Sequence, residues 1–232
     1  MKTYAIIPSG GIGKRINSSL PKQYIKIKGK ELITYTLEIF QKSEIIDKII
    51  VAAQPEYFHL LEEIKIKYNI SKLFKIIEAG KERQNSVFNA LMATDANNDD
   101  LIVVHDAARP LLSQKILTTA IKEAKTFDNI IVALKTNDTL VSGNQFVQGY
   151  LDRKSTFLAQ TPQISRFKIL IDAMKLAINT NYFGTDESMV LFKAANKIKI
   201  VEGSVYNFKI TNDEDLDLFK NICDIKTCWL SN

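Results

Sequence analysis

The sequence predicts an α/β fold, in which a mostly parallel sheet is flanked by helices and a β-hairpin arm protrudes. Short apolar runs rich in β-branched residues alternate with segments of helical periodicity along most of the chain. These runs are too apolar to leave one face in water, as is typical of strands covered by helices on both sides. One long polar segment interrupts the alternation after Leu134 and predicts the arm.

The elements of the predicted sheet follow one another in chain order, with short apolar, β-branched runs predicting strands and helical periodicity predicting helices. Strands are expected at "TYAIIP" (3–8), "DKIIVAA" (47–53), "FKIIEA" (74–79), "DLIVVHD" (100–106), "NIIVAL" (129–134) and "KIKIVEG" (197–203). Helices are expected at "ELITYTLEIFQK" (31–42), 55–68, 84–93, 113–127, 165–179, 186–196 and from "NDEDLDLFK" (212–220). Ligands of such sheets bind outside the carboxyl ends of the strands, so the loops there are the candidate sites.

The polar segment "KTNDTLVSGNQFVQGYLDRKSTFLAQ" (135–160) has alternating stretches on each side of a Ser-Gly-Asn turn signal. This pattern predicts a β-hairpin. A two-stranded arm is marginally stable alone in water, so we expect it to pack against another subunit. The prediction is a homodimerisation arm at about 135–158.

The composition indicates one globular domain spanning 1–232, with 46% hydrophobic and 25% charged residues. The formal net charge of +5 suits anionic ligands, but the basic residues are spread along the chain, which disfavours nucleic-acid binding. With no signal-peptide pattern and no apolar run near the ~20 residues of a membrane span, we expect a cytoplasmic protein without a membrane partner. The two cysteines, Cys223 and Cys228, suggest neither a disulfide framework nor a zinc site.

The loop "SGGIGKR" (9–15), which follows the first strand, is the first candidate ligand site. It is not a Walker loop, because Pro8 and Arg15 stand where that loop needs a glycine and a Ser or Thr. It is not a dinucleotide fingerprint, because the third glycine of that motif is replaced by Ile16. A different phosphate-bearing ligand is indicated.

This loop and the segment after it contain glycines, which let the backbone approach a ligand, and cations, which suit phosphate oxygens. These residues are Gly10, Gly11, Gly13, Lys14, Arg15 and Lys22. Pro21 restrains the backbone beside Lys22 and biases Leu20 toward an extended conformation, so the lysine is expected on a stiffened loop. The alternative is a strand-to-helix turn with ordinary surface cations.

"HDAARP" (105–110) places an acid and an arginine directly after another apolar strand. Asp106 could orient a hydroxyl or hold a metal, and Arg109 could pair with phosphate. The alternative is an Asp106–Arg109 ion pair that stiffens the turn. His105 is expected to be a hydrogen-bonded structural histidine and not a base.

Three further segments carry candidate ligand groups. "AGKERQNSV" (79–87) could bind a base or phosphate through its amides and the Ser86 hydroxyl, or could simply cap a helix. Arg153, in "DRK" (152–154), and Lys209, in "NFKIT" (207–211), are ordinary cations when each is taken singly. Together with the two loops described above, these segments would place glycines, cations and an acid on one sheet, which suggests a site for a pair of heavily anionic reactants.

Several motifs, in order and spacing, resemble the 2-C-methyl-D-erythritol 4-phosphate cytidylyltransferase family of isoprenoid biosynthesis, over about residues 3–220. They are "PSGGIGKR" with "PKQY", "HDAARP", "DR" eight residues before "TPQ", "TDE" (185–187) and "NFKIT". The resemblance implies a Rossmann-like nucleotide-diphospho-sugar transferase fold and a homodimer formed through the arm. It also implies attack of the sugar-alcohol phosphate on the α-phosphorus of CTP, with release of pyrophosphate.

The resemblance assigns roles to individual residues. It implies that Arg15 and Lys22 contact the triphosphate and that Arg153 and Lys209 contact the attacking phosphate. The residues implied to contact the nucleotide are Ser9, Gly10, Gly11, Gly13, Gly80, Lys81 and Ser86. Those implied to contact the acceptor or the ribose are Asp106, Ala107, Arg109, Thr161 and Thr185. Of these, Arg15, Lys22, Arg153 and Lys209 would be catalytic, by positioning and electrostatic stabilisation. Mg²⁺ would be held largely by the CTP phosphates. On the arm, Arg153 and Thr161 could serve the partner's site.

The sequence departs from the family at two places and leaves two other functions open. Ser9-Gly10 replaces two alanines, and Lys81 replaces a common acidic residue. One alternative is a ribitol-5-phosphate cytidylyltransferase, which usually has "HDAVRP" and an arginine before an aspartate in the arm, whereas this chain has Ala108 and the order Asp152-Arg153. The other is a non-catalytic nucleotide-binding module, which would not need cations at the α-phosphate.

Overall fold

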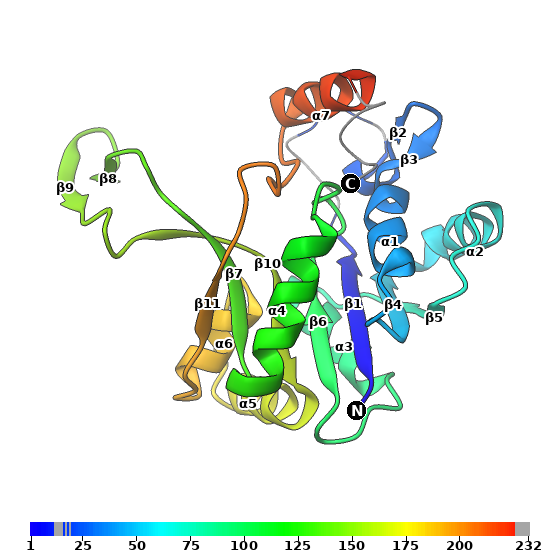
Figure 1. The fold of residues 1–232 in the computed structure, drawn as a ribbon, viewed down its shortest axis with the longest axis horizontal. Helices are drawn as coiled ribbons and strands as arrows, with labels where there is room; N and C mark the ends of the chain where they lie inside the picture. Colours follow the sequence, from blue (N-terminus) through cyan, green and yellow to red (C-terminus); the bar gives the residue numbers. More distant parts are fainter. Residues whose placement is uncertain (12–15, 17, 19, 226–232) are drawn as a thin grey trace.

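A computed structural model describes residues 1–11, 16, 18 and 20–225 of the chain. Within them, a seven-stranded sheet has the order β11-β7-β10-β6-β1-β4-β5 (Figure 1). Its strands are β1 (Thr3–Ser9), β4 (Lys48–Ala53), β5 (Leu73–Glu78), β6 (Leu101–Val104), β7 (Ile130–Lys135), β10 (Phe157–Arg166) and β11 (Lys199–Glu202). The predicted α/β class is confirmed.

Seven α-helices are described on and around this sheet, and the predicted helices agree with them to within a few residues. They are α1 (Leu32–Lys42), α2 (Phe58–Lys67), α3 (Arg83–Met92), α4 (Gln114–Phe127), α5 (Phe167–Asn179), α6 (Glu187–Lys193) and α7 (Asp213–Ile225). Two short 3₁₀ turns, η1 (Lys22–Tyr24) and η2 (Pro55–Tyr57), precede α1 and α2. The helix expected at 186–196 is shorter than predicted, because α6 ends at Lys193 and Ala195 has a positive φ of 59°.

The central strands are buried on both faces, as their apolar sequences predict. Along β1, Ala5 and Ile7 belong to one core with α1, α2 and α4, whereas Tyr4 and Ile6 belong to a second core with α3, α5 and α6. This period of two follows from the alternation of side chains along a strand. A third core cluster joins α7 to the start of α1, through Phe219 and other apolar residues.

One strand of the main sheet was not predicted. β10 (Phe157–Arg166) runs antiparallel between β6 and β7, whereas the other neighbours in this sheet are parallel. The prediction gave its first residues to the arm and its last two to a helix. Its buried stretch contains the polar residues Gln160, Thr161, Gln163 and Ser165, so it lacks the apolar signal of the other strands.

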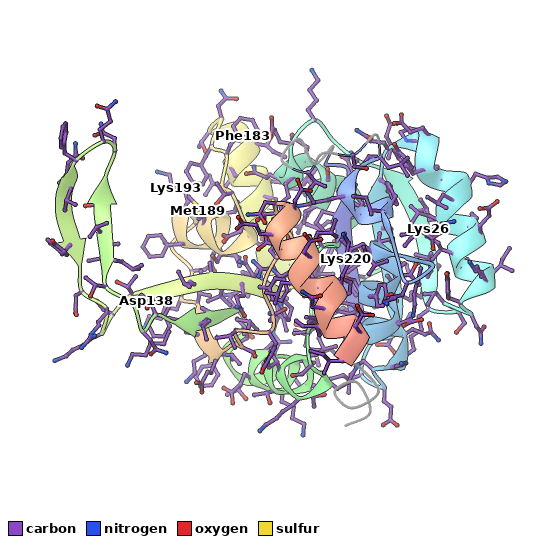
Figure 2. All side chains as sticks on the ribbon, turned by 90° about the horizontal axis from the view of Figure 1, so that it is seen from above. Lys26, Asp138, Phe183, Met189, Lys193 and Lys220 are labelled. Carbon is purple, nitrogen blue, oxygen red and sulfur yellow. The ribbon has the colours of Figure 1, made fainter. Side chains whose placement is uncertain are left out.

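The predicted hairpin is present as a separate two-stranded sheet of β8 (Leu140–Gly143) and β9 (Val147–Leu151). It stands apart from the body in two perpendicular views (Figure 1 and Figure 2). Large apolar side chains are exposed on it, with Phe146 at 80% and Tyr150 at 72%. Another small sheet pairs β2 (Lys26–Ile27) with β3 (Lys30–Glu31). Among the described helices, none is long and apolar enough to span a bilayer.

The parallel strands bring distant loops to one edge. β1 pairs in register with β6 from Thr3 opposite Leu101 to Ile6 opposite Val104. The loops after these strands, which begin at Gly10 and His105, therefore leave the sheet at the same edge. This edge carries the cavity described next.

Candidate active site

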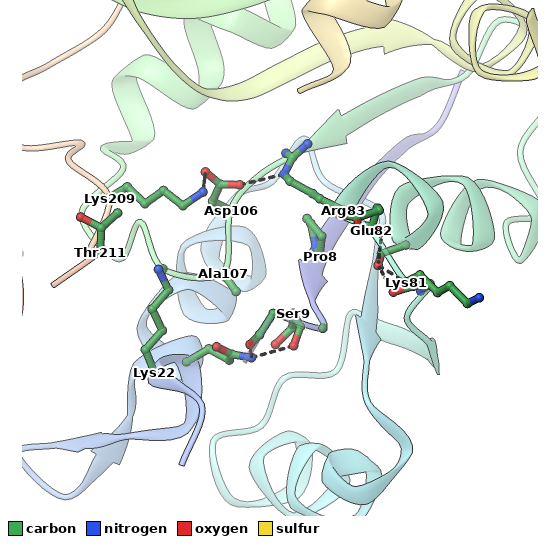
Figure 3. A pocket seen from close by; sticks show the side chains of 16 residues that line it. Pro8, Ser9, Lys22, Lys81, Glu82, Arg83, Asp106, Ala107, Lys209 and Thr211 are labelled. Atoms are coloured by element: carbon green, nitrogen blue, oxygen red, sulfur yellow. Dashed lines mark hydrogen bonds and ion pairs between the residues drawn. The ribbon is translucent and has the colours of Figure 1, made fainter. Parts of the chain in front are cut away.

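A cavity of about 350 Å³ lies at the carboxyl edge of the sheet (Figure 3). The residues of the sequence prediction that line it are Ser9, Gly10, Gly11, Lys22, Gly80, Lys81, Ser86, Asp106, Ala107 and Lys209. They come from separate segments that the sheet topology brings together. Three residues predicted for the same site, Gly13, Lys14 and Arg15, lie outside the described residues.

The glycine loop packs closely against the segment that joins β5 to α3, and that segment packs in turn against the first turn of α3. A Cβ atom on Gly10 would lie 2.4 Å from the Cβ of Ala79, and one on Gly80 would lie 2.3 Å from the Cβ of Asn85. Either approach is far inside van der Waals contact, so both positions need glycine for steric reasons. Around Gly11, in contrast, an added Cβ would meet nothing within 4 Å. The backbone at Gly10 and Gly80 thus forms a narrow wall of the cavity.

Gln23 lines the cavity and holds this loop, although the sequence prediction gave it no role. Its Nε2 donates to the carbonyl oxygens of Ser9 at 2.7 Å and of Gly11 at 2.9 Å. The Ser9 hydroxyl also lies 3.1 Å from the Tyr24 hydroxyl. The only signal in the sequence was the position of Gln23 beside Lys22, because nothing local indicates which carbonyls its amide meets.

The segment before α3 combines a helix cap with the cavity wall. Ser86 Oγ accepts from the Gly80 amide at 3.0 Å and lies 3.0 Å from the Glu82 carbonyl, to which it donates. Glu82 and Asn85 form a reciprocal capping box. The Lys81 side chain points away from Asp106 and Lys22 (Figure 3). The helix-cap interpretation is therefore confirmed, and the same segment borders the cavity.

Asp106 is the centre of a charge cluster. Its Oδ1 accepts from Arg83 Nε at 3.2 Å, and its Oδ2 lies 3.0 Å from Lys209 Nζ and 3.2 Å from Arg109 Nε. Burial by itself would raise the pKa of Asp106, but the charges of Arg83, Lys209 and Arg109 outweigh it and hold the pKa well below its usual range. The carboxylate is thus fixed in its ionised form.

Arg109 and Thr161 lie behind Asp106 and hold its loop. Arg109 Nη1 donates to the carbonyl of Asn207 at 2.7 Å, and only 11% of its side chain is exposed. The Asp106 amide donates to Thr161 Oγ1 at 3.1 Å. The predicted alternative of an Asp106–Arg109 ion pair is therefore present, and it stiffens the turn.

His105 is a structural histidine, as expected. Its ring is fully buried, with Nε2 lying 3.1 Å from the Arg109 carbonyl and Nδ1 lying 3.0 Å from Thr161 Oγ1. A carbonyl only accepts, so Nε2 carries the proton and the Thr161 hydroxyl donates to Nδ1. Burial lowers the pKa of His105 to about 4. The neutral ring thus orients Thr161, which in turn orients the Asp106 amide.

The segment 209–211 carries one ammonium group of the cavity and binds another. Lys209 reaches Asp106, and Lys22 Nζ donates to the Ile210 carbonyl at 2.7 Å. Both side chains lie on the same side of the cavity as Thr211 (Figure 3). Thr211 is held by Asp215 of α7, which accepts from its amide at 2.7 Å. The cavity therefore presents two cations from chain segments that are far apart in the sequence.

Besides Arg109 and Thr161, two further predicted residues do not line this cavity. Thr185 lines an adjoining cavity of about 350 Å³, which shares Glu82 and Arg83 with the first. Arg153 lies on the arm, exposed, between β9 and β10. Thr185 could be reached by a ligand that extends past Arg83, whereas Arg153 does not meet the cavity of its own chain.

The comparisons with known proteins agree on one family. The family model described as "IspD: 2-C-methyl-D-erythritol 4-phosphate cytidylyltransferase" matches residues 3–224. A relative of that name from Clostridioides difficile (strain 630) is 36% identical over 223 residues, covering 95% of this chain and 93% of the relative. One from Syntrophus aciditrophicus (strain SB) is 36% identical over 220 residues, covering 94% of each chain.

Solved structures give the same result. The crystal structure of the Francisella tularensis 2-C-methyl-D-erythritol 4-phosphate cytidylyltransferase superposes with a TM-score of 0.81 at 33% identity, covering 94% of this chain and 98% of that chain. The two chains therefore share their fold over nearly their whole lengths. Sequence motifs, site geometry and comparisons lead to one conclusion: the chain belongs to the 2-C-methyl-D-erythritol 4-phosphate cytidylyltransferase family.

Proposed function

We propose that this protein transfers the cytidylyl group of CTP to 2-C-methyl-D-erythritol 4-phosphate. An oxygen of the acceptor's phosphate attacks the α-phosphorus of CTP and forms a new phosphorus–oxygen bond. The bond from the α-phosphorus to the oxygen that bridges to the β-phosphate breaks, and pyrophosphate leaves with the electron pair. The observation that carries the proposal is the convergence of Lys22 and Lys209 on a cavity walled by a glycine loop.

Catalysis of this step needs fixed positive charge more than covalent chemistry, because negative charge is redistributed over the phosphate oxygens in the transition state. We assign Lys22 to the triphosphate and Lys209 to the attacking phosphate. Asp106 and the Ile210 carbonyl hold the two ammonium groups beside the cavity before any substrate enters. Such preorganisation avoids the cost of orienting the cations during the reaction. Arg15 has the proposed role of a further triphosphate contact.

The glycine wall would receive the nucleotide. The backbone at Ser9, Gly10 and Gly11 and the Gly80 turn line the same cavity, and Ser86 holds the Gly80 amide in place. The side chains of Asp106 and Lys209 line the opposite part of the cavity, where the acceptor phosphate would lie (Figure 3). Arg109 and Thr161 would act on the acceptor by orienting Asp106, and Thr185 would border the acceptor from the adjoining cavity.

Mg²⁺ would supply additional positive charge on the triphosphate. The carboxylates that line the described cavity are those of Glu82 and Asp106, and both Asp106 oxygens already face cations. Among the described residues, no group of three or more His, Cys, Asp or Glu side chains could hold a metal ion. This chemistry fits an ion bound mainly by phosphate oxygens. The residues nearest to it would be those of the glycine loop and Lys22.

A homodimer is part of the proposal, with the arm of each chain completing the site of the other. The arm exposes Phe146 and Tyr150, and large apolar surfaces of this kind are typical of protein interfaces. Arg153 does not reach the cavity of its own chain, so its proposed contact with the acceptor phosphate requires the partner's arm. A cytoplasmic location also stays a prediction.

Pyrophosphate release by the purified protein with CTP and Mg²⁺ tests this function. The acceptors offered in parallel are 2-C-methyl-D-erythritol 4-phosphate and D-ribitol 5-phosphate. We expect rapid release with the first and little with the second. The reverse preference would assign the protein to ribitol phosphate, and CTP binding without release in either reaction would indicate a non-catalytic module.

A further inference from the structure

Arg83, which lines the cavity, forms a bidentate ion pair with Glu187. Glu187 begins α6, and only 2% of its side chain is exposed. Arg83 begins α3 and donates from Nη1 to Oε1 at 2.6 Å and from Nη2 to Oε2 at 3.0 Å. Burial raises the pKa of Glu187, and the Arg83 charge opposes this effect. One guanidinium therefore binds both oxygens of a buried carboxylate.

The same guanidinium reaches the reaction site with its remaining nitrogen. Arg83 Nε donates to Asp106 Oδ1 at 3.2 Å, and Asp106 Oδ2 lies 3.0 Å from Lys209 Nζ. A continuous series of charged contacts therefore runs from Glu187 through Arg83 and Asp106 to Lys209. It joins the starts of two helices to the loop after β6 and to the segment before α7.

The planar shape of the Arg83 side chain links its contact with Glu187 to its contact with Asp106. A guanidinium is planar, and when one edge is bound by a carboxylate the direction of its Nε–H bond is determined as well. Glu187 therefore decides where Arg83 meets Asp106. A lysine would keep the charge, but its single nitrogen could not bind both oxygens of Glu187 and one of Asp106 in this geometry. Size and charge alone do not explain an arginine here.

We propose that Arg83 and Glu187 are positioning residues for the transfer reaction, which hold the Asp106 carboxylate so that it places the Lys209 ammonium at the cavity wall. This inference rests on the proposed function, in which Lys209 binds the attacking phosphate. The competing explanation is that the pair only ties α3 to α6. The two explanations differ in whether the effect of Arg83 depends on Lys209.

Arg83→Lys, made alone and in a Lys209→Ala background, tests that dependence. Pyrophosphate release at saturating CTP gives kcat and KM for the acceptor, calorimetry gives the Kd for CTP, and thermal unfolding gives Tm. We expect kcat/KM for the acceptor to fall at least about tenfold in the otherwise unchanged chain. In the Lys209→Ala background the same substitution should cost less than about twofold, because the residue through which it acts is absent. CTP affinity should stay within about twofold in both.

Arg166→Lys is the matched control. Arg166 is the last residue of β10, directly before α5, and its Nε lies 2.5 Å from Asp128 Oδ1. Within the sheet it lies opposite Leu101, the first residue of β6. Arg166→Lys therefore perturbs an arginine–carboxylate ion pair at the opposite edge of the sheet from the cavity, with a carboxylate more exposed than that of Glu187. We expect its kcat/KM to stay within about twofold of that of the unsubstituted protein.

Equal fractional losses for Arg83→Lys in the two backgrounds would overturn the inference, as would a loss of CTP affinity as large as the loss of kcat/KM. If Arg83→Lys does not fold, Glu187→Gln decides instead, since glutamine keeps the size of the side chain and one accepting oxygen. Glu187→Gln should likewise lower activity in the otherwise unchanged chain but not in the Lys209→Ala background. An unsubstituted protein that releases no pyrophosphate would overturn the proposed function, and this inference with it.

Discussion

The side-chain amide of Gln23 lies 2.7 Å from the carbonyl oxygen of Ser9, at the point where β1 ends and the glycine loop begins. A second contact from the same nitrogen to the Gly11 carbonyl, at 2.9 Å, makes this one side chain a brace for the loop. The described part of the loop, Ser9 to Gly11, has no long side chain of its own to restrain the backbone, so these two contacts help to determine its shape. The brace is the first feature to test.

Gln23→Glu is expected to weaken CTP binding about tenfold, because a carboxylate of the same size would face two carbonyl oxygens without a proton to donate. Isothermal titration with CTP measures the change. Gln114→Glu is the control, since Gln114 also donates to a backbone carbonyl, that of Ile39 at 2.6 Å, but does not line the cavity. Equal CTP affinities for Gln23→Glu and the unsubstituted protein would contradict a role in shaping the loop.

Gly10→Ala is expected to lower the free energy of unfolding by about 1–3 kcal/mol, the usual cost of forcing an atom into a packed region. The added Cβ would lie 2.4 Å from that of Ala79, so the loop or the segment after β5 must move. Gly11→Ala is the matched control because its added Cβ meets nothing within 4 Å. Urea unfolding of both variants measures the difference, and equal stabilities would show that the loop moves freely.

Lys22→Ala and Lys209→Ala should each lower kcat about 100-fold or more while the protein stays folded, by analogy with the loss of one preorganised donor to a developing charge. Pyrophosphate release measures kcat, and circular dichroism reports the fold. Lys220→Ala is the control, because Lys220 lies on the exposed side of α7 and pairs with Asp217 (Figure 2). Near-normal turnover by either site variant would remove its assigned role.

His105 should make the protein less stable as the pH falls from about 6.5 to about 4. Its pKa is lowered from 6.5 to about 4 in the folded protein, so in this range the unfolded chain binds a proton that the folded chain does not. The contribution of His105 to the free energy of unfolding is complete above the pKa of histidine in the unfolded chain. It is lost as the pH falls to the pKa of His105 in the folded protein, by about 3 kcal/mol in total.

The free energy of unfolding, measured in urea between pH 4 and 7.5, tests this pH dependence. His105→Gln should flatten it relative to the unsubstituted protein, and the contributions of other titrating groups cancel in that comparison. His59→Gln is the control, because the His59 side chain is 86% exposed. A pH dependence that is the same in His105→Gln and in the unsubstituted protein would show that His105 is not the group that titrates.

Mixing two inactive variants tests whether the arm serves the partner's site. Arg153→Ala removes the arm cation, and Lys22→Ala removes a cavity cation. In a mixed dimer, the Arg153→Ala chain keeps its own Lys22 and receives Arg153 from its partner, so one of the two sites is complete. We expect about one quarter of the activity of the unsubstituted protein after subunit exchange. No recovery despite measured exchange would place Arg153 elsewhere.

Much of the fold could be predicted because its strands and helices carry local signals. The continuous apolar, β-branched runs of β1, β4 and β6 indicate buried strands, and the helical period of α1 and α4 indicates helices, so both signals lie within the element. β10 could not be found in this way. Its buried Gln160 and Gln163 are stabilised by contacts with residues far along the chain, such as the Ser204 carbonyl, 2.8 Å from Gln160 Nε2, and the Ser188 amide, 2.7 Å from Gln163 Oε1.

The sequence by itself determined the family, the helices that cover the sheet, the hairpin and most of the residues that line the cavity, because motif spacing and periodicity are properties of neighbouring residues. Only the tertiary structure decided which side chains meet. It placed Gln23 under the glycine loop and joined Glu187 to Asp106 through Arg83. The physical reason is that hydrogen bonds and ion pairs act over about 3 Å, and only the packing of distant segments brings those atoms within that range.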